Sequence, residues 1–306
     1  EDARSAKGRV EGRAEADISI AEALSLASAQ IVADPAFAVP VGGLIEWEPL
    51  TIRANESPAG LQRLKNWGAF EGVLLALIAR EDGRDEVIGS AVIVAPGIAI
   101  AARHVVDHVI YGLQNNTTHL LCFGVTSHCA ELWRIHKVTC LANAGLAILG
   151  LVRASKLPEE PLRLAAMTTR MPKIGDRLLV TGFRADGDVQ RVVDKRFLVQ
   201  GNVLVSQGTV TQRFIDGRDQ IMLPSSCVEV DCDSVGGMSG GPVFDESGQL
   251  IGVLSSSVSS GDGSSPSFVS LIWPALIARF EGGWPSGLFQ GVTSLLDLGS
   301  GLRFID

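Results

Sequence analysis

The chain has 306 residues, 46% of them apolar, and a formal net charge of −8 at pH 7. This length is enough for one large domain or two small ones, each with a sizeable core. The acidic excess and the lack of any long Lys/Arg run disfavour a nucleic-acid-binding face. The longest apolar stretches fall far short of the roughly 20 residues that cross a bilayer. We therefore expect neither nucleic acid nor a membrane as a partner.

The five cysteines are an odd number, and their spacings suggest no disulfide framework for a chain of this size. Residues 1–17 alternate charges with Ala and Gly and lack the apolar core of a secretion signal. Both observations favour a reducing compartment, and we expect a cytoplasmic protein. Because the chain begins with Glu1 rather than Met, a longer precursor stays open.

The first predicted elements form an N-terminal extension over residues 1–65. A helix-like apolar spacing runs from Asp17, a plausible cap, to Ile31 and ends before a Pro at position 35. The stretch 36–57 is rich in Pro and Gly and reads as an irregular connector, followed by a short helix around Leu61–Trp67. We expect this extension to lie outside the main fold.

After Gly68 the sequence predicts two blocks of short strands, each rich in branched apolar residues and bounded by turn signals. The first block comprises 73–78, 87–94, 98–101, 120–123 and 146–152; the second comprises 177–183, 191–200, 202–211, 227–230, 250–255 and 268–272. Such spacing favours two packed all-β units, barrels or sandwiches, over a parallel sheet. We expect units over 66–170 and 171–281, a helix at Ala275–Phe280, and a C-terminal extension over 282–306.

The most informative segment is Gly-Met-Ser-Gly-Gly-Pro-Val-Phe at positions 237–244. A serine flanked by glycines can sit on a tight turn whose amides point at one spot, as a nucleophilic serine needs when it attacks a carbonyl. The N–H groups of Gly237 and Ser239 would be the donors. The plain alternative is a glycine-rich turn between two strands.

A second segment, 135 residues upstream, changes that balance. Ile88 begins a strand, a Pro-Gly turn and a second strand follow, and His104 comes next before a short apolar helical turn. Alone, His104 would be a satisfied structural histidine. Together the two segments resemble, in order and separation, the trypsin-like serine proteases, and within them a bacterial intracellular or Deg-type branch. The resemblance covers roughly residues 66–281.

This resemblance implies a fold and a chemistry. The fold is all-β, with two six-stranded antiparallel β-barrels of the chymotrypsin type, and His104 and Ser239 meet in the cleft between them. The activity is that of a serine endopeptidase on protein or peptide substrates, with Ser239 forming an acyl-enzyme and His104 acting as general base. Gly237 and Ser239 would form the oxyanion hole, and no cofactor is implied.

The third motif of the family is altered. An Asp normally precedes a Leu-Ala-hydrophobic-Leu strand, and here Gly145 stands in its place before Leu146-Ala-Ile-Leu. Asn143 could at best be a neutral partner of His104, and Asp107 fits a solvated surface position. If Gly145 merely replaces a lost acid, Gly145→Asp should raise the rate; if a carboxylate from another segment has taken over, the substitution should do nothing or harm. The rival reading is therefore a catalytically weakened or inactive protease-fold module that binds or scaffolds.

Two positions near the serine bear on activation and specificity. Met238 stands where digestive relatives carry an Asp that captures a new N-terminus, so we do not expect activation by such trimming. Asp233 and Ser234 have the spacing of the primary pocket acid and its neighbour, and a buried carboxylate there would favour Lys or Arg before the cleaved bond. Asp231 equally resembles a position that is often Asp in Deg-type proteases, which keeps a preference for Val, Ala or Leu open.

A window of 22 residues gathers several potential metal ligands: His119, Cys122, His128, Cys129, His136 and Cys140. Their spacings match no zinc pattern, and alternation along a strand sends neighbouring side chains to opposite faces. We expect no metal site here. A further reading assigns the N-terminal and C-terminal extensions to binding a protein partner.

Overall fold

The computed structural model describes residues 47–50, 62–63, 70–124, 131–141, 143–154, 162–192, 196–257, 266–285, 288–289 and 291–298. The helix expected between Asp17 and Ile31 and the end of the C-terminal extension lie outside the described residues. The short helix expected around Leu61–Trp67 is wrong where the structure describes it. Gln62 and Arg63 form β2 and pair with Leu204 and Val205, so pairing with a barrel edge outweighs local propensity.

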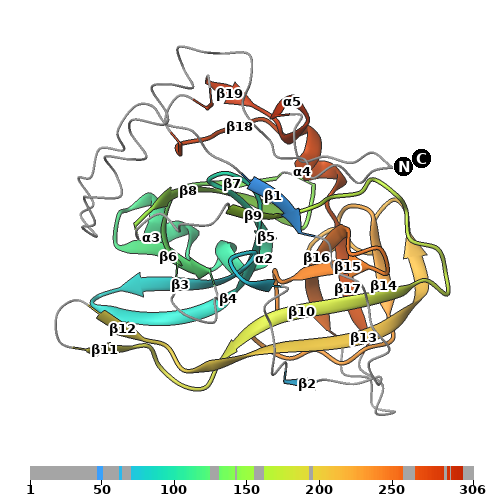
Figure 1. Cartoon of the computed structure of the whole chain (residues 1–306), viewed down its shortest axis with the longest axis horizontal. Coiled ribbons are helices and arrows are strands. Elements are labelled where there is room, and N and C mark those ends of the chain that lie inside the picture. Colours follow the sequence, from blue (N-terminus) through green and yellow to red (C-terminus); the bar gives the residue numbers. More distant parts are fainter. Residues whose placement is uncertain are drawn as a thin grey trace.

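The first half of the fold is a closed antiparallel barrel (Figure 1). Its strands, in order around the barrel, are β3 (Leu74–Glu81), β4 (Arg84–Ala95), β5 (Ile98–Ala102), β8 (Leu146–Arg153), β7 (Glu131–Cys140) and β6 (Thr118–Gly124). The turn between β4 and β5 needs Gly97, whose φ is +69° and whose Cβ would lie 2.0 Å from the Trp284 carbonyl oxygen. This turn sends β5 back toward the segment that carries His104.

The second half is also a closed barrel of six strands. Its sheet runs β10 (Arg177–Ala185), β15 (Pro242–Asp245), β16 (Leu250–Ser257), β17 (Ser267–Leu271), β14 (Cys227–Val230) and β13 (Gly201–Phe214), and a further pairing of β10 with β13 closes the ring. All of these pairings are antiparallel. The expected all-β fold with two six-stranded antiparallel barrels is therefore confirmed.

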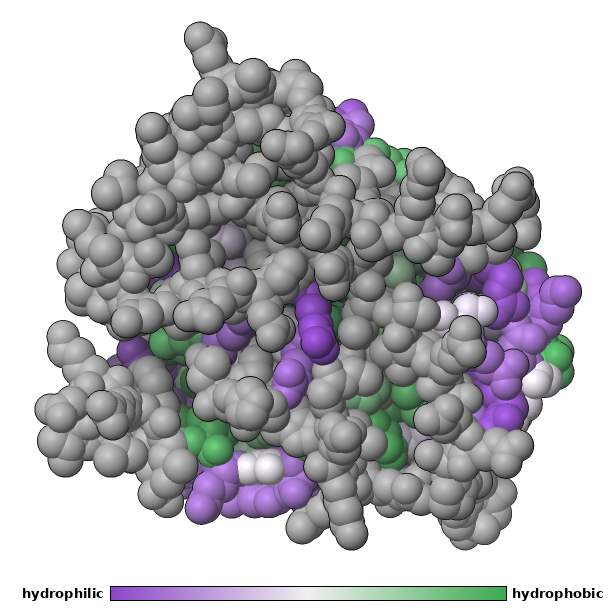
Figure 2. Space-filling model, in the orientation of Figure 1, coloured by the Kyte–Doolittle hydropathy of each residue, from purple (hydrophilic) through white to green (hydrophobic). Residues whose placement is uncertain are grey.

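The two barrels pack on one another through buried apolar side chains. Phe123 of β6 meets Phe183 of β10 edge to face, with ring centroids 5.4 Å apart, and Phe70 lies 6.0 Å from Phe244. Such aromatic contacts add to the stabilisation that comes from burying apolar area. In Figure 2, the hydrophobic residues that show on this face form small separate areas, and hydrophilic ones cover the right-hand edge. The contact between barrels is what brings the segments of His104 and Ser239 together.

Shorter elements complete the described structure. They are β1 (Trp47–Leu50) and β9 (Leu162–Ala165), which pair in parallel, β11 (Gln190–Val192) with β12 (Arg196–Leu198), β18 (Phe280–Glu281) with β19 (Val292–Thr293), and the helices α2 (Arg103–Asp107), α3 (Ile110–Gln114), α4 (Trp273–Ile277) and α5 (Leu295–Leu298). None of the described helices has the length and apolar character needed to cross a membrane. The domain boundaries expected at residues 65/66, 170/171 and 281/282 stay predictions.

Candidate active site

His104 lies at the start of α2, directly after β5. Val105 and Val106 are buried and anchor this short helix on the first barrel, which leaves the His104 side chain half-buried. Burial lowers the pKa of His104 below its ordinary value of 6.5; the Asp107 carboxylate opposes this shift, and His108 adds to it. The imidazole is therefore neutral near pH 7, the state that a general base requires.

Ser239 lies in the turn that connects β14 to β15. Gly237 and Gly240 flank the serine segment with φ values of +93° and +84°, a region that suits glycine. Met238 is fully buried in the core of the second barrel, and Gly182 makes room for it because a Cβ there would lie 2.5 Å from the Met238 Cα. The buried Met238 side chain therefore anchors the turn in the core of the second barrel.

The two segments meet across small residues of the first barrel. A Cβ on Gly89 would lie 2.8 Å from a Val105 methyl group and 3.0 Å from the Ser239 carbonyl oxygen. A Cβ on Gly240 would lie 3.1 Å from the Ala102 nitrogen. The neighbours of His104 and the Ser239 turn are thus in direct contact, and glycine is what permits the approach.

The turn also leaves two amides without an acceptor. The N–H groups of Gly237 and Ser239 have no hydrogen-bond acceptor within the described part of the chain. Their neighbours are occupied: the N–H of Met238 donates to the Val235 carbonyl at 3.2 Å and that of Gly240 to the Leu254 carbonyl at 2.7 Å. Two free amides beside a serine can bind the oxyanion that forms when the serine attacks a carbonyl.

The position of the usual catalytic acid is the altered part of the site. The N–H of Arg103 donates to the Gly145 carbonyl at 2.9 Å, which places Gly145 beside the His104 segment. A Cβ on Gly145 would lie 2.8 Å from the Met222 carbonyl oxygen, 3.0 Å from the Ser270 hydroxyl oxygen and 3.8 Å from that of Ser255. We call this region, defined by Gly145, Met222, Ser255 and Ser270, the acid slot. The hydroxyls of Ser255 and Ser270 are buried, and neither has a hydrogen-bond partner among the described residues.

Comparison with known proteins places this arrangement in a family. Among solved structures, the apo protease domain of MamO from Magnetospirillum magneticum is 14% identical over 68% of this chain and 95% of that chain, with a TM-score of 0.45. The active form of the Rv3671c protease from M. tuberculosis is 15% identical over 78% of this chain and 89% of that chain, with a TM-score of 0.45. The HtrA-type protease AlgW with a decapeptide is 16% identical over 65% and 61%, with a TM-score of 0.44. No curated protein matches by sequence.

The deciding observation is the match of a family model. The model of the trypsin-like peptidase domain matches residues 89–253, which is more than half of the chain and includes His104 and Ser239. The chain belongs to the trypsin-like peptidase family. Its class is therefore that of the trypsin-like serine proteases, whose substrates are peptides and proteins. The expected placement in a bacterial intracellular or Deg-type branch stays a prediction.

In this trypsin-like peptidase, the acid slot is closed by the loop between β13 and β14. One carboxylate oxygen of Asp219 accepts the N–H groups of Met222, Ile221 and Leu223, at 2.7, 3.0 and 3.3 Å. Burial works to raise the pKa of Asp219, but these backbone N–H groups outweigh it and hold the pKa below its ordinary value. Leu223 is fully buried in a small core with Cys227 and Phe268. The loop is therefore fixed with the Met222 carbonyl directed at Gly145.

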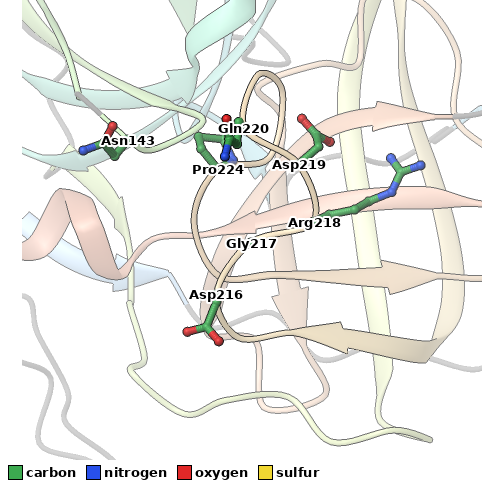
Figure 3. A pocket seen from close by; sticks show the side chains of 7 residues that line it. All are labelled: Asn143, Asp216, Gly217, Arg218, Asp219, Gln220 and Pro224. Carbon is green, nitrogen blue, oxygen red and sulfur yellow. The ribbon is translucent and has the colours of Figure 1, made fainter.

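The same loop borders a cavity of about 500 Å³ (Figure 3). The lining residues are Asn143, Asp216, Gly217, Arg218, Asp219, Gln220 and Pro224. Asn143 is exposed and has a φ of +59°, and Figure 3 shows it on the segment that faces the loop. The Arg218 guanidinium lies 4.0 Å over the Phe268 ring. Among the described residues, no carboxylate of this cavity acts on His104, and no hydrogen bond joins Asn143 to it, so the neutral-partner role of Asn143 stays a prediction.

Asp107 lies where a surface residue was expected. It is exposed, and its carboxylate pairs with Arg103 of the same helix at 3.1 Å. Neither ring nitrogen of His104 has a hydrogen-bond partner among the described residues. Asp107 therefore influences His104 through its charge and does not orient the ring.

The predicted specificity residues differ from expectation. Asp233 is exposed, and no described residue forms a hydrogen bond or ion pair with it, so the expectation of a buried pocket carboxylate is corrected. Ser234 is half-buried, and its hydroxyl oxygen accepts the Ser267 hydroxyl at 2.8 Å. Asp231 is structural, because its carboxylate accepts the N–H of Thr209 on the neighbouring strand β13.

Sequence reasoning missed three serines of this site, namely Ser90, Ser255 and Ser270. Ser90 lies inside the histidine segment, in the Gly-Ser-Ala-Val stretch, but nothing in that pattern assigns it a role. Ser255 and Ser270 lie in strands β16 and β17, where small polar residues give no signal until the strands are placed beside Gly145. Of the potential metal ligands, the structure gathers no group of three or more within the residues that it describes.

Proposed function

We propose that this chain is a serine endopeptidase that works with Ser239 and His104 and without the usual third residue. His104 takes the proton of the Ser239 hydroxyl while its oxygen bonds to the substrate carbonyl carbon. The proton then passes to the leaving amine as the C–N bond breaks, and water hydrolyses the resulting ester. The amides of Gly237 and Ser239 bind the oxyanion in both steps.

The observation that carries this proposal is the turn around Ser239. It leaves two amides free of described acceptors beside a serine, in a turn that contacts the His104 segment. Preorganised donors of this kind usually supply the largest single part of the rate enhancement in acyl transfer. Loss of the orienting acid costs on the order of 10⁴ in turnover where the wrong imidazole tautomer results. We therefore expect slow proteolysis that stays well above the uncatalysed rate.

A fluorophosphonate probe tests the proposal, because only an activated serine reacts with it readily. Mass spectrometry is expected to place one adduct on Ser239. Ser239→Ala should abolish labelling, and His104→Gln should slow it strongly because the serine keeps its proton. Ser247→Ala removes an exposed serine from the same segment of the second barrel and should label like the wild type. An adduct on another serine would refute the assignment.

The acid slot supports one rival function, a binding or scaffold module. Backbone from the Met222 loop fills space that an acidic side chain at position 145 would need, so the missing acid is more than a point substitution. A module of this kind would bind peptides in the cleft and form no adduct. If the wild type forms no adduct with the probe, calorimetric titration with unstructured peptides would identify such a module by measuring peptide binding.

For substrate preference, we propose a weak selection for Lys or Arg before the cleaved bond. The Asp233 carboxylate is exposed, so water and salt screen its attraction for a basic side chain. A modest ratio between basic and apolar substrates follows, rather than the strict selection that a buried carboxylate would give.

A further inference from the structure

We propose that Ser90 is the positioning residue that holds the oxyanion-binding turn in its active shape. This inference rests on the proposed function and concerns how the turn is kept ready. In digestive relatives an acid beside the nucleophile pairs with a new N-terminus, and Met238 cannot form that ion pair. Another group must therefore fix the turn, and Ser90, on strand β4 of the other barrel, is placed to do so.

Ser90 forms two hydrogen bonds to the turn, one on each side of Met238. Its backbone N–H donates to the Ser239 carbonyl at 2.8 Å. Its hydroxyl donates to the Gly237 carbonyl at 2.9 Å. One residue of the first barrel thus holds the Gly237–Met238 and the Ser239–Gly240 peptide groups, one on each side of the Met238–Ser239 peptide.

A third bond sets the direction of the Ser90 hydroxyl. The N–H of Phe183 donates to the Ser90 oxygen at 2.9 Å, which leaves the hydroxyl hydrogen for a carbonyl acceptor. The Gly237 carbonyl at 2.9 Å is the better acceptor, since the Phe183 carbonyl lies at the limiting distance of 3.5 Å. Ser90 is 0% exposed, so water cannot compete for these bonds.

The Gly237 carbonyl, which Ser90 binds, belongs to the residue whose N–H is one of the two proposed oxyanion donors. Gly237 can adopt many backbone conformations, and its φ of +93° is only one of them. Ser90 fixes the Gly237–Met238 and Ser239–Gly240 peptide planes, and the Met238–Ser239 plane between them, which carries the Ser239 N–H, is held by the Gly241 N–H on the Met238 carbonyl at 2.9 Å. Fixing the Gly237–Met238 plane also restricts the rotation of Gly237, so the N–H groups of Gly237 and Ser239 keep their relative orientation before substrate arrives, without any cleavage of the chain.

The test compares Ser90→Ala with Thr181→Val. Thr181 is also fully buried, and its hydroxyl donates to the Pro242 carbonyl at 3.1 Å, three residues after the nucleophile. Both variants lose a buried hydroxyl bond to this segment, but only Ser90→Ala frees the Gly237 carbonyl. We expect kcat on a peptide ester to fall on the order of 10- to 100-fold in Ser90→Ala, with KM nearly unchanged. Thr181→Val should keep the wild-type kcat.

Two further measurements separate positioning from general damage. The affinity for a peptide aldehyde, whose serine adduct uses the oxyanion hole, should fall in Ser90→Ala in parallel with kcat. Amide hydrogen exchange of residues 237–241 should accelerate in Ser90→Ala and not in Thr181→Val. If Ser90→Ala does not fold, Ser90→Cys replaces it, because it keeps the volume with a weaker donor. Its kcat should fall below the kcat of wild type and of Thr181→Val.

The outcomes distinguish this inference from the proposed function. If the wild type neither reacts with the probe nor turns over substrate, the proposed serine peptidase activity is refuted. The exchange measurement would still show whether the hydrogen bonds of Ser90 fix the turn. Equal exchange and equal kcat in the Ser90 and Thr181 variants would overturn the positioning role.

Discussion

The turn around Ser239 and the acid slot around Gly145 both contact the segment that carries His104, and they are built in opposite ways. Around Ser239, hydrogen bonds from Ser90 and burial of Met238 fix the backbone, and two amides stay without an acceptor among the described residues. In the acid slot, two buried hydroxyls have no partner in the described structure, and a backbone carbonyl closes the space.

This difference indicates which part of catalysis the chain keeps. In the proposed mechanism, stabilisation of the oxyanion needs only the turn around Ser239, whose two amides have no other acceptor among the described residues. Orientation of the His104 ring and stabilisation of the imidazolium need a group bonded to the other ring nitrogen, and no residue in the described part of the chain is bonded there. We therefore expect that the substrate can acylate Ser239, but slowly, because His104 works poorly as the general base.

The largest effect on this comparison should come from substituting Gly145. Gly145→Ala adds a Cβ against the Met222 carbonyl and should cost about 1–3 kcal/mol of unfolding free energy, measured by urea denaturation. Gly145→Asp adds the same Cβ together with a carboxylate that the Ser255 and Ser270 hydroxyls can satisfy. Its kcat should exceed that of Gly145→Ala on the order of 10- to 1,000-fold.

The alanine variant is the matched control, because the sequence expectation that Gly145→Asp simply raises the rate ignores the Met222 backbone. Comparison with wild type alone would mix loop displacement with the gain of charge. Equal kcat in Gly145→Ala and Gly145→Asp would show that a carboxylate in the acid slot does not act on His104.

A smaller effect is expected from Asp107, which acts on His104 through its charge. Because the Asp107 carboxylate raises the pKa of His104, Asp107→Asn should lower that pKa further. A general base works in its neutral form, so the acid limb of kcat/KM should move to lower pH and activity near pH 5 should rise a few-fold. Activity at pH 8 should not change. A large loss at every pH would instead make Asp107 the orienting acid.

The smallest effect should be on specificity. Asp233→Asn is expected to reduce the ratio of kcat/KM for Lys over Leu substrates by about two- to fivefold, since an exposed charge contributes little. Asp231→Asn is the control: that carboxylate also is exposed, but it binds the Thr209 N–H and should leave the ratio unchanged. A profile of cleavage sites in a denatured proteome measures both. An unchanged ratio in Asp233→Asn would assign the residue no part in specificity.

The fold and the tight turn around Ser239 could be predicted from the sequence because their signals are local. Short apolar runs and Pro-Gly turns predict strands, and a serine between glycines predicts a tight turn. Strand β7 was missed, since it carries Arg134, His136 and Lys137 and does not alternate cleanly. The expected strand over 191–200 is instead the hairpin β11–β12, with its turn outside the described residues.

The state of the acid slot could not be predicted, because its parts come from four distant segments. Gly145 alone suggests an open space that an Asp could refill. Only the structure shows that Met222, 77 residues later, places a carbonyl against it. Likewise, the exposure of Asp233 depends on how the loops pack and not on its spacing from Ser239.

The central claim, that His104 works without an orienting carboxylate, can be measured on the imidazole itself. The chain has five histidines, so ¹⁵N NMR with His104→Gln as the assignment control can follow this ring through a pH titration. The account predicts a pKa below 6.5 that falls further in Asp107→Asn, and no slowly exchanging ring N–H bonded to a carboxylate. A pKa above 6.5 together with a low-field ring N–H resonance that persists in Asp107→Asn would contradict it.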